Sequence, residues 1–145
     1  MRKEIDVGEI GSLVGYHLQR ALAFSPNYRG VGKGRRLRQG SIGILSVVAA
    51  NPGINQTSVA NALRIKRANM VALIDDLVEY GLLKRNMTPH DRRVRALTLT
   101  AAGRKKLSAI LRDIGRLEAK LLAGFSRQER NMLMELLSRV HKLDE

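Results

Sequence analysis

The sequence predicts a mostly α-helical protein with one small β-hairpin, flanked at both ends by further helices. Apolar residues recur at intervals of three and four through most of the chain, which is typical of amphipathic helices. Just before residue 100 the period changes to two, because Leu97 and Leu99 alternate with threonines as in a half-buried strand. Aromatic residues make up only 3% of the chain, so the expected core is aliphatic, which suits packed helices.

The first helix is expected from about Val7 to Phe24. Ser25-Pro26-Asn27 ends it, because proline cannot continue the helical hydrogen-bond ladder. A basic, glycine-rich segment follows, from Tyr28 to Gln39. It is no nucleotide-binding P-loop, since its glycine spacing is wrong and Lys33 is followed by Gly34 where that motif needs Ser or Thr. We interpret this segment as a basic loop.

Three shorter helices are expected next, over about Gly40–Ala50, Gln56–Leu63 and Lys66–Tyr80. Asn51-Pro52-Gly53 ends the first of them, and Asn55 is an expected N-cap for the second. Gly81 stands where a helix end favours a left-handed residue. The pair of short helices, joined by a tight turn at about Arg64-Ile65, is therefore a helix-turn-helix candidate.

The hairpin and two C-terminal helices complete the expected order. Leu82–Arg85 and Arg95–Thr100 are short enough to be strands, and the polar residues between them predict a basic-tipped turn. A long apolar stripe then runs to about Gly124. Ser126-Arg127-Gln128-Glu129 is a capping box that opens a final helix. The sequence thus predicts a winged helix-turn-helix flanked by dimerisation helices, divided into residues 1–40, 41–100 and 101–145.

The charge balance points to a polyanionic partner. The chain holds 26 Lys and Arg against 13 Asp and Glu, which gives a formal net charge of +13. Nucleic acid is the expected partner, because neutralised phosphates release counterions. A non-specific nucleoid or RNA-binding protein would share this composition, but it would not explain the long apolar stripes at both ends. Footprinting would distinguish a sequence-specific regulator from this alternative. A regulator protects a short palindrome, whereas a nucleoid protein protects all of the DNA.

Several other classes of protein are not expected. There is no Cys, which excludes disulfides and cysteine-ligated zinc. His17, His90 and His141 are scattered without the spacing of a metal or nucleophile site, so we expect no enzyme, metal or cofactor. No apolar run resembles a signal peptide or a membrane span, and the expected location is the cytoplasm.

The expected DNA contacts lie in the second helix of the pair and in the hairpin. The N-terminal turn of that recognition helix holds Lys66, Arg67 and Asn69, and such side chains read guanine and adenine in the major groove. Arginines at the hairpin tip suit the narrow minor groove, and Lys84 and Arg85 are expected near phosphates. The full set of predicted DNA contacts is Gln56, Thr57, Lys66, Arg67, Asn69, Met70, Lys84, Arg85, Arg92, Arg93 and Arg95.

These segments resemble the MarR-type winged-helix regulators. The resemblance is carried by Asn55–Ala60, by Met70–Arg85, and by the run Asp91-Arg92-Arg93-Val94-Arg95-Ala96-Leu97-Thr98-Leu99-Thr100, followed by Ala102-Gly103. The last run looks like the family's D-x-R-x-x-x-(aliphatic)-x-L-T signature. Residues 1–40 match only in outline.

The resemblance implies a homodimer that binds a palindromic operator, usually represses, and releases DNA on binding a small, often aromatic, anionic ligand. By the motif, Asp91 would orient Arg93, the minor-groove arginine. Ser and Thr, frequent at the start of the family's recognition helix, are replaced here by Lys66, Ala68 and Asn69, so the operator cannot be carried over from relatives. The absence of Cys excludes the branch that senses peroxide through cysteine.

The predicted effector site has two parts, and each has an alternative. Tyr16, His17 and Arg20 would contribute to an apolar pocket between the first helix and the second, although His17 is more simply explained as a core or interface residue bonded to the backbone. Arg36 and Arg38 lie in the basic loop, which carries more charge than one carboxylate needs. Phosphates of an aryl-acyl-CoA thioester would use that charge, and so would DNA phosphates. A basic linker of this kind is more usually just a solvated connection, and all three interpretations of the loop remain open at this point.

Overall fold

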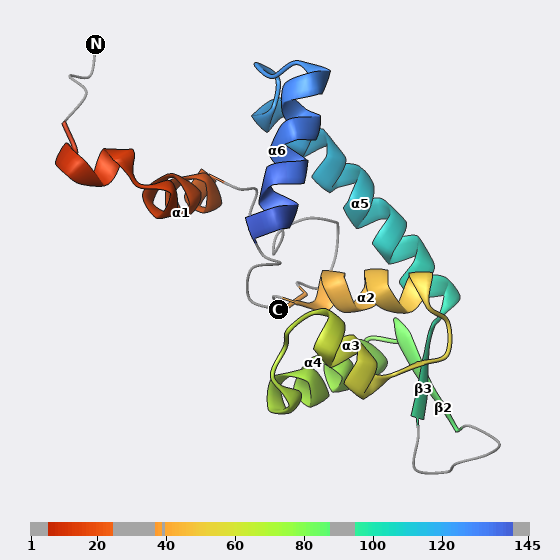
Figure 1. Ribbon diagram of the computed structural model, residues 1–145. Coiled ribbons are helices and arrows are strands. Elements are labelled where there is room, and N and C mark those ends of the chain that lie inside the picture. Colours follow the sequence, from red (N-terminus) through yellow and green to blue (C-terminus); the bar gives the residue numbers. More distant parts are fainter. Residues whose placement is uncertain (1–5, 25–36, 39, 88–94, 141–145) are drawn as a thin grey trace. The chain divides into compact units, whose positions relative to one another are not determined.

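The structure, a computed structural model, describes residues 6–24, 37–38, 40–87 and 95–140 (Figure 1). The chain divides into two compact units, one from residues 27–116 and one from residues 1–26 together with 117–145. The elements confirm a mostly helical fold with a small antiparallel sheet.

The unit of residues 27–116 combines helices with a three-stranded sheet. Its helices are α2 (Ser41–Ala50), α3 (Gln56–Ala62), α4 (Arg67–Glu79) and the first part of α5 (Ala101–Leu121). The strands β1 (Ile54–Asn55), β2 (Leu83–Met87) and β3 (Arg95–Leu99) are antiparallel in the order β1-β3-β2. The pairing of β2 with β3 puts Leu83 opposite Leu99 and Met87 opposite Arg95, which confirms the predicted hairpin. Residues 88–94, the predicted tip, lie outside the described residues.

The strand β1 was not expected from the sequence. It has two residues, and Ile54 lies opposite Leu97 of β3. The N–H of Gly53, at φ +89°, donates to the carbonyl of Leu97 over 2.9 Å and leads the chain into this pairing. A two-residue strand is too short to show an alternating pattern, so periodicity could not reveal it.

One aliphatic core joins the helices to the sheet in this unit. The side chains of α2, α3, α4 and α5 meet those of β2 and β3 with almost no exposed surface. Full burial of one such side chain stabilises the fold by about 1.5–3 kcal/mol, which makes this core the main support of the α3–α4 pair. The most completely buried apolar residues are Ile44, Leu45, Val48, Val59, Met70, Ile74, Leu77, Leu83, Leu97 and Ile110.

Thr100 joins the sheet to α5. Its hydroxyl accepts the N–H of Gly103 at 2.9 Å and donates to the carbonyl of Gly81 at 2.6 Å. A Cβ built on Gly103 would lie 2.1 Å from the carbonyl oxygen of Leu82, so only glycine fits at this position. This contact gives a physical reason for the pair Thr100 and Gly103 in the sequence motif.

The N-terminal segment differs from the single helix expected over Val7–Phe24. A 3-10 helix, η1 (Gly8–Ser12), is followed by extended Leu13 and then by α1 (Val14–Phe24). Gly8 has φ +65° and its N–H is held by the Asp6 carboxylate at 2.8 Å, which starts a tight turn. The hydroxyl of Ser12 donates to the carbonyl of Glu9 at 2.7 Å, in competition with a regular helical ladder. The expected continuous helix is therefore wrong before Val14.

The capping box at the start of α6 (Arg127–Val140) is confirmed. The Ser126 N–H donates to the Glu129 carboxylate at 2.7 Å, and the Glu129 N–H donates back to the Ser126 hydroxyl at 3.2 Å. The backbone hydrogen bond first, and the Ser126 side chain second, hold the pKa of the Glu129 carboxyl below its ordinary value. The start of this helix is thus set locally, by side chains three residues apart.

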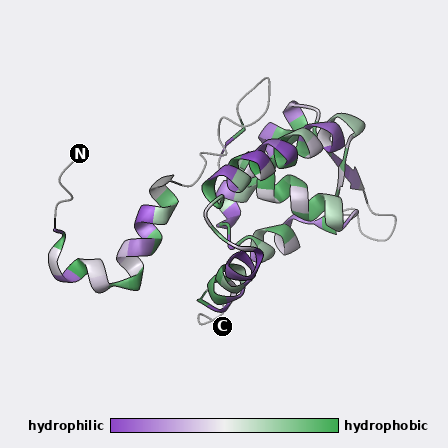
Figure 2. Cartoon of the chain, turned by 90° about the horizontal axis from the view of Figure 1, so that it is seen from above, coloured by the Kyte–Doolittle hydropathy of each residue, from purple (hydrophilic) through white to green (hydrophobic). Residues whose placement is uncertain are grey.

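Large apolar side chains stay exposed on the helices outside the α2–α4 core. Apolar positions alternate with polar ones along α1 and α6 (Figure 2), and α6 has no buried residue. In the described helices, no segment is long and apolar enough to cross a membrane. The exposed apolar residues of α1, the second half of α5, and α6 with the turn before it are Val14, Leu22, Leu111, Leu117, Leu121, Phe125, Met132, Leu133, Met134, Leu136, Leu137 and Val140.

Candidate nucleic-acid interface

The turn between α3 and α4 sets the geometry of the helix pair. Arg64 adopts φ +50°, unusual for a residue with a side chain, and the N–H of Ile65 donates to the carbonyl of Ala60 at 3.0 Å. This hydrogen bond closes the end of α3 and reverses the chain. Lys66 is extended at the N-cap of α4, and Arg67 begins the helix. The predicted turn at Arg64-Ile65 is confirmed.

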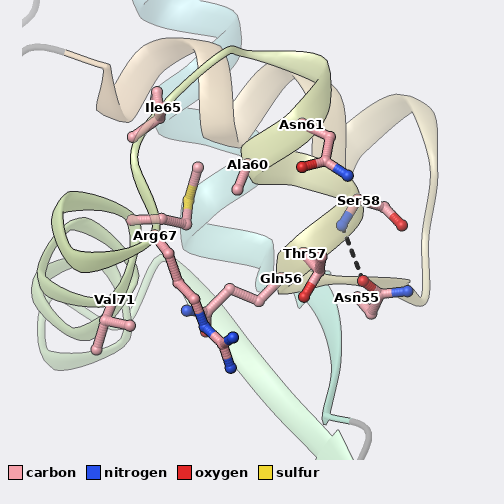
Figure 3. Close-up of a pocket in the computed structure, with 10 residues that line it drawn as sticks. Asn55, Gln56, Thr57, Ser58, Ala60, Asn61, Ile65, Arg67 and Val71 are labelled. Carbon is pink, nitrogen blue, oxygen red and sulfur yellow. Dashed lines mark hydrogen bonds between the residues drawn. The ribbon is translucent and has the colours of Figure 1, made fainter.

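The first turn of α3 is fixed by Asn55. Its side-chain oxygen accepts the N–H of Ser58 at 2.9 Å, which confirms the predicted N-cap. Gln56 and Thr57 follow directly and line a concavity between α3 and α4 (Figure 3). The cap therefore places both residues at one end of the helix pair.

The concavity has a volume of about 630 Å³ and combines polar and apolar groups. In Figure 3 the side chain of Arg67 extends from α4 towards Gln56 on α3. Hydroxyl and amide groups of α3 form one wall, and Arg67 and Val71 belong to the other. Such a surface offers hydrogen-bond donors and acceptors, a positive charge and an apolar contact to one ligand, as base edges require.

Among the predicted contacts on α4, the exposed ones are Lys66, Arg67 and Asn69. Successive helical residues are rotated by about 100°, so Arg67 and Asn69 lie on different sides of α4. The structure does not support the predicted DNA contact of Met70. Its side chain is 0% exposed and belongs to the core, so it supports the helix and does not reach a DNA surface.

The wing strand carries two further predicted contacts. Lys84 is exposed, as a phosphate contact must be. Arg85 donates a hydrogen bond to the Asp75 carboxylate of α4, and its side chain is only 22% exposed. Arg95 begins β3, with its backbone opposite Met87. Asp91, Arg92 and Arg93 lie outside the described residues, so the predicted wing-tip contacts are not described.

The predicted effector residues fall in both units. On α1, the Arg20 guanidinium donates to the Tyr16 hydroxyl at 2.9 Å and lies 5.6 Å from the centre of that ring. A ring nitrogen of His17 lies 2.7 Å from the carbonyl oxygen of Gly11, the backbone bond considered as the alternative to a ligand contact. Arg38 donates to Asp76 of α4 at 3.0 Å. Arg36 lies outside the described residues.

Two features of this region were missed at the level of sequence. The neighbours Asp75 and Asp76 bind arginines from β2 and from the segment before α2, and no periodicity links residues so far apart. Val71 on α4 is exposed, and its helical phase could have shown this, because it falls off the stripe of buried residues. In the described part of the chain, no group of three His, Cys, Asp or Glu residues could hold a metal ion.

The comparisons with known proteins agree with this arrangement. The MarR family profile matches residues 38–94, a range that includes α2, β1, α3, α4 and β2. A protein of Thauera aromatica, assigned to the transcriptional regulation of the hcr operon, is 32% identical over 143 residues, which cover 97% of this chain and 86% of that protein. The chain belongs to the MarR family. It is therefore a member of a family of transcriptional regulators.

Two solved structures extend the similarity of this MarR-family protein to nearly its full length. The transcriptional repressor CouR, bound to a 23-mer DNA duplex, is 34% identical with a TM-score of 0.86, covering 96% of this chain and 99% of that one. CouR bound to p-coumaroyl-CoA is 33% identical with a TM-score of 0.79, covering 95% and 98% of the two chains. The predicted winged helix-turn-helix fold is thereby confirmed.

Proposed function

We propose that this MarR-family protein is a repressor that binds a palindromic operator as a homodimer and leaves it on binding a small anionic aromatic ligand. The observation that carries the proposal is the α3–α4 pair, whose shared concavity opens between Gln56, Thr57 and the exposed Arg67. A net charge of +13 supplies the long-range attraction to DNA. Similarity to a repressor bound to a DNA duplex supports the same function, and family membership supports a regulator in place of an enzyme.

The operator would be read mainly by α4 and the wing. Arg67 and Asn69 are the proposed base readers, with Gln56 and Thr57 as further contacts from α3. Lys84 and Arg85 would lie near phosphates. Loss of a bidentate base contact costs about 1–3 kcal/mol and relaxes the preference at that base pair. Arg93, oriented by Asp91, would enter the minor groove, together with the other wing-tip arginines Arg92 and Arg95. Arg93→Ala should weaken operator binding at matched salt, and an unchanged affinity would refute the wing assignment.

We also propose which segments form the dimer and which bind DNA. Residues 1–40 and 101–145 would form the dimer, and residues 41–100 would bind DNA. The exposed apolar side chains of α1, α5 and α6 support this, because soluble monomers avoid large apolar patches. Twofold symmetry of the dimer would then place two half-sites about one turn of DNA apart.

The effector we propose is an aryl-acyl-CoA thioester. Similarity to a repressor bound to p-coumaroyl-CoA supports this class of ligand. Tyr16, His17 and Arg20 would contribute to the aryl site, and Arg36 and Arg38 would meet the phosphates. Arginine suits phosphate because its planar guanidinium donates two parallel hydrogen bonds.

Two measurements test these proposals. Footprinting on the DNA around the protein's own gene should protect a short palindrome, whereas protection of all DNA would support the non-specific nucleoid alternative. Calorimetry should detect binding of p-coumaroyl-CoA or feruloyl-CoA, and the bound thioester should release the DNA. Binding of the free acids without the thioesters would refute the thioester and retain an aromatic acid as the ligand.

A further inference from the structure

Val71 is an exposed apolar residue in the middle of the recognition helix. The neighbouring α4 side chains Met70, Leu73 and Ile74 are buried, whereas Val71 is 41% exposed. Valine has a lower helix propensity than alanine, so nothing in the local backbone favours it at an exposed helical position. A single exposed apolar residue needs no explanation by itself. The position of Val71 on α4, however, suggests a reason for its exposure.

Val71 lies one helical turn after Arg67, and both side chains line the concavity between α3 and α4 (Figure 3). Residues four apart share a helix face, so the arginine and the valine approach the same ligand. Of the residues between them, Ala68 and Asn69 are exposed and Met70 is buried. The small side chain of Ala68 leaves the backbone of this face open to close approach.

We propose that Val71 is a specificity-determining residue that packs against the C5-methyl group of a thymine in each operator half-site. This inference rests on the proposed function as an operator-binding protein. In the major groove only thymine presents a methyl group, and apolar side chains recognise it by contact. One helical turn advances about 5.4 Å, and successive base pairs are about 3.4 Å apart. The thymine therefore lies one or two base pairs from the base that Arg67 contacts.

The next residue on this face limits the reading stretch. Asp75 lies one turn beyond Val71, and its carboxylate is occupied by Arg85 of β2. An ionised carboxylate repels phosphates and contributes no contact to thymine. The base-reading part of α4 thus ends at Val71. Each half-site then contains a base contacted by Arg67, followed by a thymine contacted by Val71.

The test uses the full chain and a library of random DNA duplexes. Duplexes selected by the wild-type protein give a consensus, and each thymine in it is then replaced by deoxyuridine, which lacks only the methyl group. Affinities are measured for the wild type, for Val71→Ala and for Glu79→Ala. The control residue Glu79 is exposed at the far end of α4, away from the concavity. Val71→Ala should fold normally, since an exposed valine is replaced by a better helix former.

We expect one thymine per half-site whose replacement by deoxyuridine weakens wild-type binding by about three- to fourfold, the value of one buried methyl group. In Val71→Ala this loss should disappear, and in Glu79→Ala it should remain. If Val71→Ala keeps the full loss, or if no thymine methyl matters to the wild type, the inference is wrong. Failure to select any consensus would instead refute sequence-specific operator binding itself.

Discussion

Asp75 of α4 accepts a hydrogen bond from Arg85 of β2, so the recognition helix and the wing strand are joined by an ion pair. The next residue, Asp76, accepts a hydrogen bond from Arg38 at 3.0 Å. Adjacent carboxylates on one helix thus hold two arginines, one from the segment before α2 and one from β2. Both arginines were expected to meet phosphates, and in the free protein both are neutralised internally.

Removing the Asp75 carboxylate should release Arg85 to a DNA phosphate. For Asp75→Asn we expect tighter binding to non-specific duplex and a salt dependence whose log–log slope steepens by about one per protomer. Fluorescence anisotropy at several NaCl concentrations measures this slope. Asp113→Asn is the matched control, because Asp113 pairs with Arg116 on α5 and its loss changes the net charge equally. An equal change in both variants would show a charge effect without release of Arg85.

The ion pair between Arg38 and Asp76 provides a way to distinguish two proposed roles of Arg38, binding of CoA phosphates and binding of DNA phosphates. If Arg38 meets the phosphates of a CoA thioester, Asp76→Ala should raise the affinity for p-coumaroyl-CoA by freeing the guanidinium. Arg38→Ala should lower that affinity by about tenfold, the loss of one charge-assisted hydrogen bond. Calorimetry on both variants shows directly whether each substitution raises or lowers the affinity for p-coumaroyl-CoA. If Arg38→Ala weakens only DNA binding, the residue belongs to the operator interface.

Gly103 should tolerate no side chain. In Gly103→Ala the added methyl group meets the carbonyl of Leu82, and we expect a loss of about 1–3 kcal/mol in the free energy of unfolding. Gly115 lies in the same helix, and a Cβ added to it would meet nothing within 4 Å, so Gly115→Ala should stabilise the protein by about 0.5–1 kcal/mol. Urea denaturation distinguishes the two. Equal effects at both positions would refute the close approach of α5 to Leu82.

The capping box predicts a pH-dependent contribution to stability. Because the pKa of Glu129 is lowered in the folded protein, its contribution is present above the unfolded-state pKa and is lost as the pH falls through the folded one. Glu129→Ala should therefore lower the thermal midpoint of unfolding at neutral pH. It should have little effect at about pH 3, which lies below the ordinary pKa range of glutamate. Calorimetric scans across this interval measure the difference. A difference that persists undiminished in acid would refute the ionised cap.

One face of α6 should be required for dimerisation. Met132, Leu136 and Val140 share that face at helical spacing and are exposed in the single chain. Leu136→Glu should place a charge in the interface and reduce the particle mass to that of one chain, 16.1 kDa, by light scattering. Met134→Glu is the control, since Met134 is 70% exposed and points to another side of α6. A wild-type protein that is monomeric at micromolar concentration would refute the dimer.

Local sequence signals predicted much of the fold. Asn55, Gly81 and the Ser126–Glu129 box mark helix ends through contacts within a few residues, and the structure confirms all three. Buried Met70 shows the limit of assigning contacts by position, because the start of the recognition helix carries both core and surface residues. The helical phase that places Met70 inside also leaves Val71 outside.

Long-range contacts were beyond prediction from one sequence. Strand β1 exists because β3 offers it a partner, and Ile54 carries no alternating pattern of its own. The break at Leu13 depends on turns around Gly8 and Ser12 that apolar spacing does not reveal. The partner of Arg38 lies 38 residues further along the chain, so its pairing follows from the folded backbone.

The hydroxyl of Thr100 has a consequence for how such a protein could change through evolution. It contacts the turn after α4 through Gly81 and the first turn of α5 through Gly103, so it fixes the rotation of α5 about its own axis relative to the sheet. A replacement that removed these bonds would let the long helix leave the sheet in another direction. In a dimer held by its terminal helices, that change would alter the separation of the two reading helices. The length of DNA recognised could thus diverge between relatives while every residue that touches a base stayed the same.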